Sequence, residues 1–196
     1  MIRPIALLAL LLAPAILPAD IKTSENRVCY DDICFTKTDK IGETQIPAHG
    51  VAKLYFWGFE VYTIALYMPE DIAPARVLEG DVPRKLDLRY HRGIDAKDIV
   101  KAKMKTLRDN PEIDLNAIRD KVDKMNGWYR DVEEGDRYEL LYEPGKGTSL
   151  IFNGQVDGTI EGEEFAKAIF SIWLSTDHSL NEGLTEDLLQ SYKTRN

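Results

Sequence analysis

The stretch that most constrains the fold of this chain is GVAKLYFWGFEVYTIALYMP, residues 50–69. It is rich in aromatic and aliphatic side chains, but Lys53, Glu60 and the Trp57-Gly58 step interrupt it, unlike a membrane span. The pattern predicts two long strands, VAKLYFW and FEVYTIALYM, joined at Trp57-Gly58. In the second strand Tyr62, Ile64 and Leu66 share one face and Thr63, Ala65 and Tyr67 share the other. Because both faces are largely apolar past Glu60, we expect this strand to be central and covered on both sides.

The remainder of the chain predicts an α+β domain with an antiparallel sheet. Alternating patterns predict strands over residues 84–92, 136–144, 148–154 and 155–160, with a hairpin turn at Asn153-Gly154. Helical patterns cover residues 73–80, 96–110, 115–125, 162–175 and 185–192. In the strand 84–92, charged residues alternate with Leu86, Leu88 and Tyr90, which predicts one wet face. The basic run KDIVKAKMKTLR is interpreted as the solvated face of a helix. Strands and helices in this order, connected by hairpins, favour α+β over a doubly wound α/β fold.

The first residues, MIRPIALLALLLAPAILPAD, are typical of a secretory signal peptide. Arg3 precedes a short apolar run, and small residues follow at the positions where a signal peptidase cuts. Cleavage after Ala15 fits the small-x-small rule best, whereas cleavage after Ala19 leaves a polar start at Asp20; we prefer Ala19. The run is too short for a membrane anchor. The sequence therefore predicts a signal peptide over 1–19 and a single periplasmic domain over 20–196.

Two cysteines, Cys29 and Cys34, bracket the sequence YDDI. In an exported chain such a close pair predicts a disulfide that clamps a tight hairpin. A redox pair usually has two intervening residues, and no histidine cluster lies beside these cysteines to complete a metal site. The structural disulfide is therefore the preferred interpretation.

Charge and motifs exclude several functions. The net charge of −8 argues against nucleic acid as a partner. In EPGKGTS, Gly147 follows Lys146 where a phosphate loop needs Ser or Thr. In DGTIEGEEFAKA, Ala168 stands where a calcium loop needs Glu. The three histidines lie far apart in the sequence, so no metal or cofactor is predicted.

Three blocks, residues 50–70, 82–102 and 142–175, together resemble the bacterial chalcone-isomerase-like proteins, in a branch usually found with a signal peptide. The resemblance extends from about Gly50 to Leu174. It implies an open-faced β-sandwich, in which a large antiparallel sheet carries a layer of helices and a ligand cleft lies between them. The stretch 50–69 would then be the long hairpin that lines this lipophilic cleft.

The resemblance does not extend to the catalytic groups of plant chalcone isomerases. These enzymes use an Arg, a Thr, a Tyr and an Asn; here the corresponding positions hold Ala52 or Lys53, then Tyr62, Ile94 and Lys101. Without the groups that orient the reacting phenolate, true chalcone isomerase activity is not expected.

The fatty-acid-binding relatives of this fold are a better match, because a Tyr and an Arg hold the ligand carboxylate there. Tyr62 stands in the Tyr position, and Lys53 is the candidate for the cation, although a lysine cannot reproduce the bidentate fork of an arginine. Arg89 and Arg92 are alternative cations. The simpler interpretation is that Tyr62 is a packed aromatic residue and that Lys53 points to water.

Three functions remain open from the sequence. The first is an exported, non-catalytic protein that binds a fatty acid or a similar small lipophilic ligand in an apolar cleft. The second is an isomerase or intramolecular lyase that acts on a non-flavonoid substrate through Tyr62 and Lys53. The third is an envelope interaction protein whose cleft is filled by its own side chains. The sequence predicts neither the oligomeric state nor the identity of the ligand.

Overall fold

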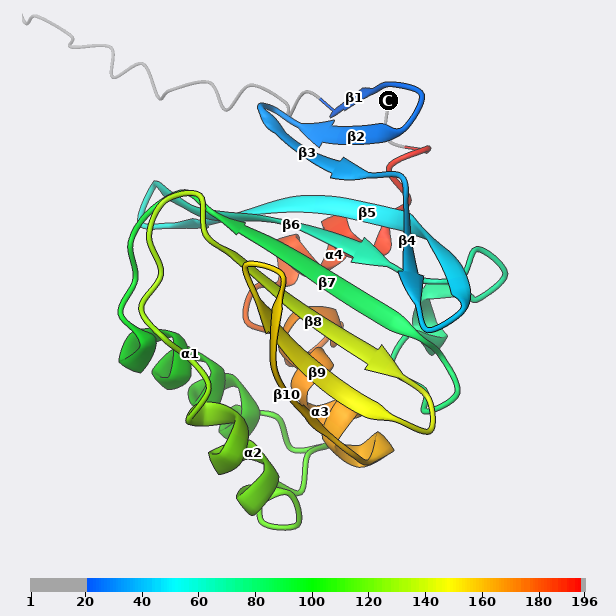
Figure 1. Ribbon diagram of the computed structural model, residues 1–196. Helices are drawn as coiled ribbons and strands as arrows, with labels where there is room; N and C mark the ends of the chain where they lie inside the picture. The colour runs from blue at the N-terminus through cyan, green and yellow to red at the C-terminus, as the bar shows by residue number, and fades with distance from the viewer. Residues whose placement is uncertain (1–20, 195–196) are drawn as a thin grey trace, which may run out of the picture.

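The fold is a seven-stranded antiparallel sheet with helices on one face and a small three-stranded sheet on the other (Figure 1). A computed structural model describes residues 21–194. The strand order in the large sheet is β10-β9-β8-β7-β6-β5-β4. Its strands are β4 (Thr38–Ile41), β5 (Thr44–Phe56), β6 (Phe59–Tyr67), β7 (Arg84–Tyr90), β8 (Arg137–Glu143), β9 (Gly147–Phe152) and β10 (Gln155–Ile160). The prediction of an α+β fold with an antiparallel sheet is confirmed.

Four helices accompany the sheet. They are α1 (Ala96–Asp109), α2 (Arg119–Asn126), α3 (Glu163–Leu174) and α4 (Glu182–Leu189). Helix α3 is apolar on nearly all sides and packs behind the sheet, whereas α1 and α2 lie at one end of it (Figure 1). The segment predicted as a helix over 73–80 forms only one 3₁₀ turn, Pro74–Arg76. No helix within residues 21–194 is both long enough and apolar enough to cross a membrane.

The small sheet consists of β1 (Ile21–Thr23), β2 (Arg27–Tyr30) and β3 (Ile33–Thr36). Cys29 and Cys34 face each other directly in the β2–β3 hairpin and form a disulfide, as predicted. We call this unit the cystine hairpin, residues 27–36. Its buried side chains Val28 and Phe35 pack against the sheet face that the helices leave uncovered. The predicted signal peptide, residues 1–19, lies outside the described residues.

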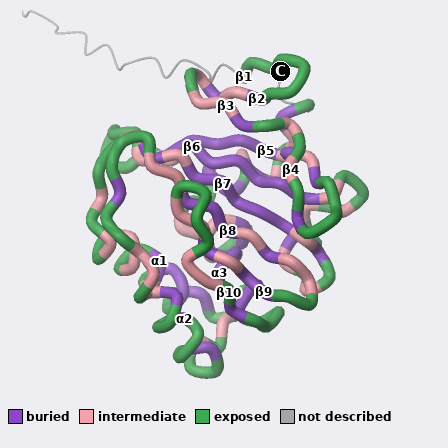
Figure 2. Tube along the Cα trace, viewed as in Figure 1, coloured by how far each residue is buried: buried purple, intermediate pink, exposed green. Residues whose placement is uncertain are grey.

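The β5–β6 hairpin contributes to two separate cores. On the helix side, Tyr62, Ile64 and Leu66 join the main core, whereas Ala65 and Tyr67 join a second core beneath the cystine hairpin. The central strands are accordingly buried along most of their length (Figure 2). The prediction that both faces of β6 are covered is therefore confirmed, and the cystine hairpin is what covers the second face.

The hairpin tip is exposed. Trp57 and Gly58 both have a positive φ, as a tight two-residue turn requires. The side chains of Tyr55, Phe56, Trp57 and Phe59 all lie largely in solvent. The aromatic residues of this stretch therefore divide into a buried set along the strands and an exposed set at the tip.

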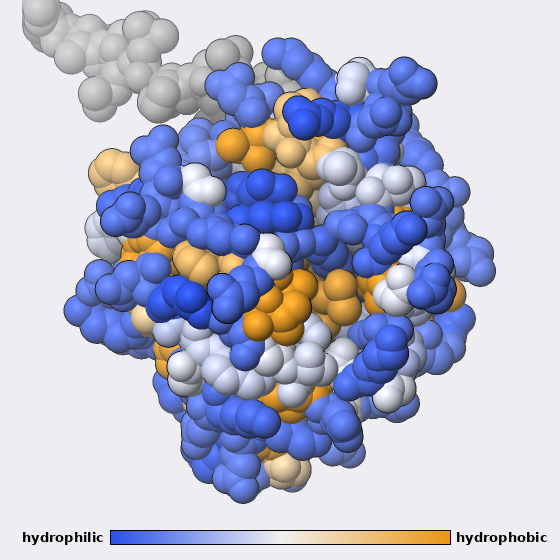
Figure 3. All heavy atoms as spheres, in the orientation of Figure 1, coloured by the Kyte–Doolittle hydropathy of each residue, from blue (hydrophilic) through white to orange (hydrophobic). Residues whose placement is uncertain are grey.

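The face of β7 that was predicted to be wet is instead buried. Lys85 and Asp87 are almost fully enclosed, because ion pairs replace water around them. Lys85 pairs with Asp39 of β4 and with Glu139 of β8, and Asp87 receives two hydrogen bonds from Arg137. Viewed from this side, the surface is mostly hydrophilic, with a hydrophobic patch over β8 and β9 (Figure 3). The polar stretch before Gly50, for which no strand was predicted, forms β4 and the first half of β5.

Candidate functional site

Tyr62 lies on the helix side of β6, inside the main core. Its hydroxyl accepts a hydrogen bond of 2.9 Å from the indole Nε1 of Trp173 on α3. Burial raises the pKa of Tyr62 well above its ordinary value, although the bond from Trp173 lowers it. The phenol is therefore neutral, enclosed and already hydrogen-bonded.

Lys53 lies on the opposite face of the sheet. Its Nζ donates to Asp31 Oδ2 at 2.7 Å and to Glu60 Oε1 at 2.9 Å. Burial opposes the charge, but these two carboxylates raise the pKa of Lys53 above its ordinary value. Because Asp31 lies in the turn of the cystine hairpin, this ion pair attaches the hairpin to β5.

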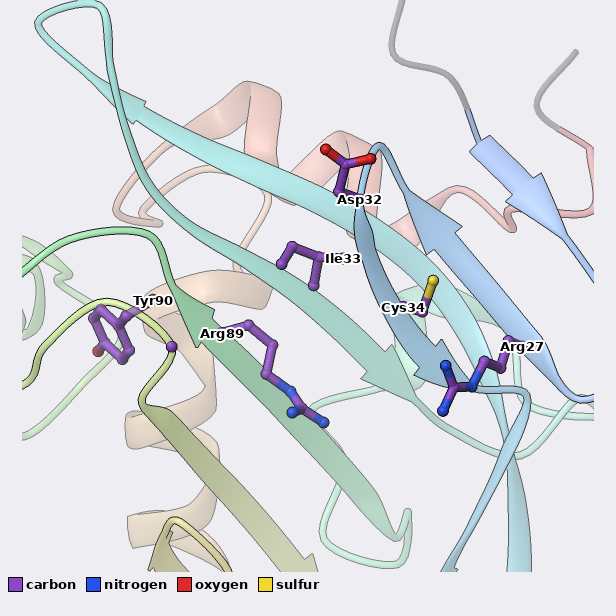
Figure 4. Close-up of a pocket in the computed structure, with 7 residues that line it drawn as sticks. Arg27, Asp32, Ile33, Cys34, Arg89 and Tyr90 are labelled. Carbon is purple, nitrogen blue, oxygen red and sulfur yellow. The ribbon is translucent and has the colours of Figure 1, made fainter.

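Arg89 shares the face of Lys53. In the sheet register both are direct neighbours of Thr63. The Arg89 guanidinium donates to Asp87 Oδ1 at 3.0 Å and lines a hollow of about 270 Å³ between β7 and the cystine hairpin. In this hollow Arg27 lies on the opposite wall, and the ring of Tyr90 turns away from Arg89 (Figure 4).

The predicted ligand-binding residues therefore do not form one site. Lys53 and Arg89 lie on the cystine-hairpin face, whereas Tyr62 lies on the helix face. A single carboxylate could not be held by Tyr62 together with Lys53. Whether any of these residues binds a ligand stays a prediction.

On the helix side, a layer of aromatic rings crosses the sheet. Its members are Tyr62, Tyr90, Tyr129, Tyr138 and Phe152. Neighbouring ring centroids are 5.6 Å apart for Tyr62 and Tyr90 and 4.9 Å apart for Tyr138 and Phe152, mostly in tilted or edge-to-face contacts. We call this set the aromatic layer. It offers apolar surface and phenolic hydroxyl groups between the sheet and the helices.

Lys103 of α1 lies at the edge of this layer. It was not predicted as a site residue from the sequence. Its Nζ is 4.5 Å from the ring centroid of Tyr129 and has no hydrogen-bond partner among the described residues. The residue is only 4% exposed. Burial lowers the pKa of Lys103 to about 7, and the carboxylate of Asp123 on α2 opposes this shift only partly.

A signal for Lys103 was present in the sequence. Ile99, Lys103 and Leu107 recur every fourth residue, so they lie on one face of α1. Leu107 is buried and Ile99 packs against the main core. The basic residues of this run were interpreted as the solvated face of a helix, and this is wrong for Lys103, which lies on the apolar stripe of Ile99 and Leu107.

Arg84, the first residue of β7, is a second buried cation that has unpaired donor atoms among the described residues. Its Nη1 donates to the carbonyl oxygens of Glu79 and Val82, and the guanidinium lies between the rings of Tyr142 and Phe170. Its Nε and Nη2 have no partner among the described residues. Burial lowers the pKa of Arg84 to about 10.

Two hollows on the described surface can be located relative to the aromatic layer. Besides the hollow near Arg89, the described surface has a hollow of about 220 Å³ at the β8–β9 turn, lined by Tyr142, Lys146 and Glu163 among others. Neither hollow is lined by Tyr62 or Lys103. Among residues 21–194, no group of three or more acidic, histidine or cysteine side chains could hold a metal ion.

A large antiparallel sheet, helices packed over one face and an aromatic layer between them define an open-faced β-sandwich of the chalcone isomerase type. The chain belongs to the chalcone isomerase-like family, whose model matches residues 29–190. Its fold is similar to the crystal structure of a fatty-acid binding protein from Arabidopsis thaliana, with a TM-score of 0.61 and 14% sequence identity. The match covers 80% of this chain and 91% of the plant protein. No curated protein sequence matches the chain.

Proposed function

We propose that this protein is an exported, non-catalytic member of the chalcone isomerase-like family that binds a fatty acid or a similar lipophilic acid. The observation that supports this proposal is the aromatic layer, which combines apolar rings with phenolic hydroxyl groups beside a buried cation. The fold similarity to a fatty-acid binding protein agrees with it. The ligand would lie between the sheet and helices α1 and α2.

Export to the periplasm is part of the proposal and rests on the N-terminal sequence. We expect the periplasmic fraction to contain a mature protein that begins at Asp20, which intact mass and N-terminal sequencing would detect. Retention of the full-length chain in the membrane fraction would contradict export.

The first test of ligand binding is native mass spectrometry of the gently purified mature protein, followed by denaturation to identify any molecule released. We expect a stoichiometric acyl species, and we expect delipidated protein to bind added oleate. A protein that is empty and ignores oleate would refute the proposal, and its family membership would then indicate fold alone.

Two adjacent residues on β7 provide a matched control for the location of the ligand. Tyr90 belongs to the aromatic layer, whereas Arg89 faces the cystine hairpin. We expect Tyr90→Leu to weaken oleate binding several-fold and Arg89→Gln to leave it unchanged. The reverse result would place the ligand in the hollow beside Arg89. Thermal unfolding of both variants checks that each is folded.

The alternative function, an isomerase or intramolecular lyase, gains one observation from Lys103. A buried amine whose pKa is about 7 has the basicity that a general base needs at neutral pH. In this enzyme hypothesis, Lys103 would act as the general base, in place of the roles predicted for Tyr62 and Lys53. Turnover of a non-flavonoid substrate that disappears in Lys103→Met would support it, whereas rates equal to the uncatalysed background across a substrate panel would leave the binding function.

A further inference from the structure

Lys103 differs from the other buried lysines of residues 21–194. Lys53 contacts the carboxylates of Asp31 and Glu60, and Lys85 contacts those of Asp39 and Glu139. The Nζ of Lys103, equally buried, has no hydrogen-bond partner in the described part of the chain. The buried ammonium groups of Lys53 and Lys85 are therefore paired with carboxylates, whereas that of Lys103 is not.

An unpaired ammonium group in a protein interior is costly, because it has lost its hydration shell without gaining an anion. The Tyr129 ring compensates only in part, through a cation–π contact. Buried cations without a partner are candidates for functional groups for this reason. Within residues 21–194, no anionic acceptor lies within hydrogen-bond distance of Lys103 Nζ.

We propose that Lys103 is the carboxylate-binding residue of the aromatic layer and that it selects monocarboxylic acyl ligands over neutral lipids. This inference rests on the proposed function. The ligand carboxylate would accept a hydrogen bond from Lys103 Nζ, and its apolar chain would lie along the rings of Tyr129, Tyr138 and Phe152. These three rings contact one another in sequence, with centroids 5.4 and 4.9 Å apart.

The ionisable surroundings of Lys103 make the interaction depend on pH. The charged group that acts on its amine is Asp123 on α2, and the ring of Tyr129 packs against the amine. Helix α3 also packs against α1, but its Lys167 lies at the surface with Glu112. On α1 itself, Lys101 and Lys105 are exposed. A bound carboxylate favours the charged amine, so binding takes up a proton when the free amine is neutral. Affinity for a carboxylate should therefore fall as the pH rises above about 7.

The test compares oleate with oleyl alcohol, which has the same chain but no charge, by calorimetric titration of delipidated mature protein. Lys103→Met removes the amine and keeps the volume. Lys101→Met is the matched control, because it removes the same charge from an exposed position of the same helix.

At pH 6.5 we expect the wild type and Lys101→Met to bind oleate more than tenfold more tightly than the alcohol. We expect Lys103→Met to lose this preference but still to bind both ligands. Between pH 7 and pH 9, oleate affinity should fall more than tenfold in the wild type and stay constant in Lys103→Met.

The outcomes separate this inference from the proposed function. If Lys103→Met keeps the preference for oleate, or if the wild type shows no pH dependence, the assignment of Lys103 is wrong and the binding function stands. If the wild type binds neither ligand, the binding function itself fails, and the assignment fails with it.

Discussion

Replacement of Lys103 by methionine should stabilise the protein. Burial lowers the pKa of Lys103 from its ordinary value of 10.5 to about 7. Each pKa unit by which the folded and unfolded states differ corresponds to about 1.4 kcal/mol. At pH 7 the buried amine therefore destabilises the folded state by up to about 4 to 5 kcal/mol. Methionine has a similar volume and no charge, and it packs well beside an aromatic ring such as Tyr129. We therefore expect Lys103→Met to raise the free energy of unfolding at pH 7 by about 3 to 5 kcal/mol.

The pH dependence gives this prediction a second signature. Because the pKa of Lys103 is lower in the folded state, the unfolded chain binds more protons between about pH 7 and pH 10.5, and stability rises with pH over that window. Between pH 7 and pH 9 this group should raise the free energy of unfolding of the wild type by about 2 kcal/mol. In Lys103→Met this pH-dependent increase should be absent.

Urea unfolding of ligand-free protein at several pH values measures both quantities, with Lys101→Met as the control for loss of a helix charge. We expect the stability advantage of Lys103→Met over the wild type to shrink as the pH rises. If this variant were no more stable than the wild type at pH 7, and the difference did not change with pH, the amine would have an ordinary pKa and the reasoning would be wrong.

Three further variants, one of them a double substitution, test the two faces of the sheet. Tyr62→Phe leaves the indole N–H of Trp173 without its acceptor. We therefore expect the free energy of unfolding, measured with urea, to fall by about 1 to 2 kcal/mol. An unchanged urea midpoint would mean that water replaces the hydroxyl as acceptor. Asp87→Asn removes the charge of a buried carboxylate that pairs with Arg137 and Arg89. We expect about 3 kcal/mol of destabilisation in urea unfolding. A change below about 0.5 kcal/mol would show that stability does not depend on these ion pairs. Cys29→Ser with Cys34→Ser should cost about 2 kcal/mol, because the bond closes a short loop, and reductant should lower the melting temperature of the wild type but not that of the double variant.

The sequence was sufficient for most of the fold, because the decisive signals are local. The β5–β6 hairpin and the Asn153-Gly154 turn follow from alternation and turn chemistry. Strand β4 was missed because its residues, Thr38 to Ile41, are mostly polar and pair with an equally polar half of β5. The buried charges of β7 were taken for a wet face because a single strand does not reveal its partners on β4 and β8.

The candidate site was less predictable, because it depends on which elements meet in space. Tyr62 was correctly placed on a largely apolar face of its strand, but the sequence could not tell that Lys53 would contact Asp31 on the opposite face. Lys103 was overlooked because lysine in a basic helix is usually solvated. Its burial arises from the packing of α1 against Tyr129 and the main core, which is non-local information.

The division of the β5–β6 hairpin between two cores has a practical consequence. The core on the helix side and the core beneath the cystine hairpin have no buried residue in common. Substitutions in the two cores that are far apart and share no partner should therefore have additive effects on stability, with coupling energies near zero in double-mutant cycles. For protein engineering, each side can then be treated as an independent module. Stabilising changes beneath the cystine hairpin could be accumulated first, and the added stability would then tolerate destabilising substitutions in the aromatic layer.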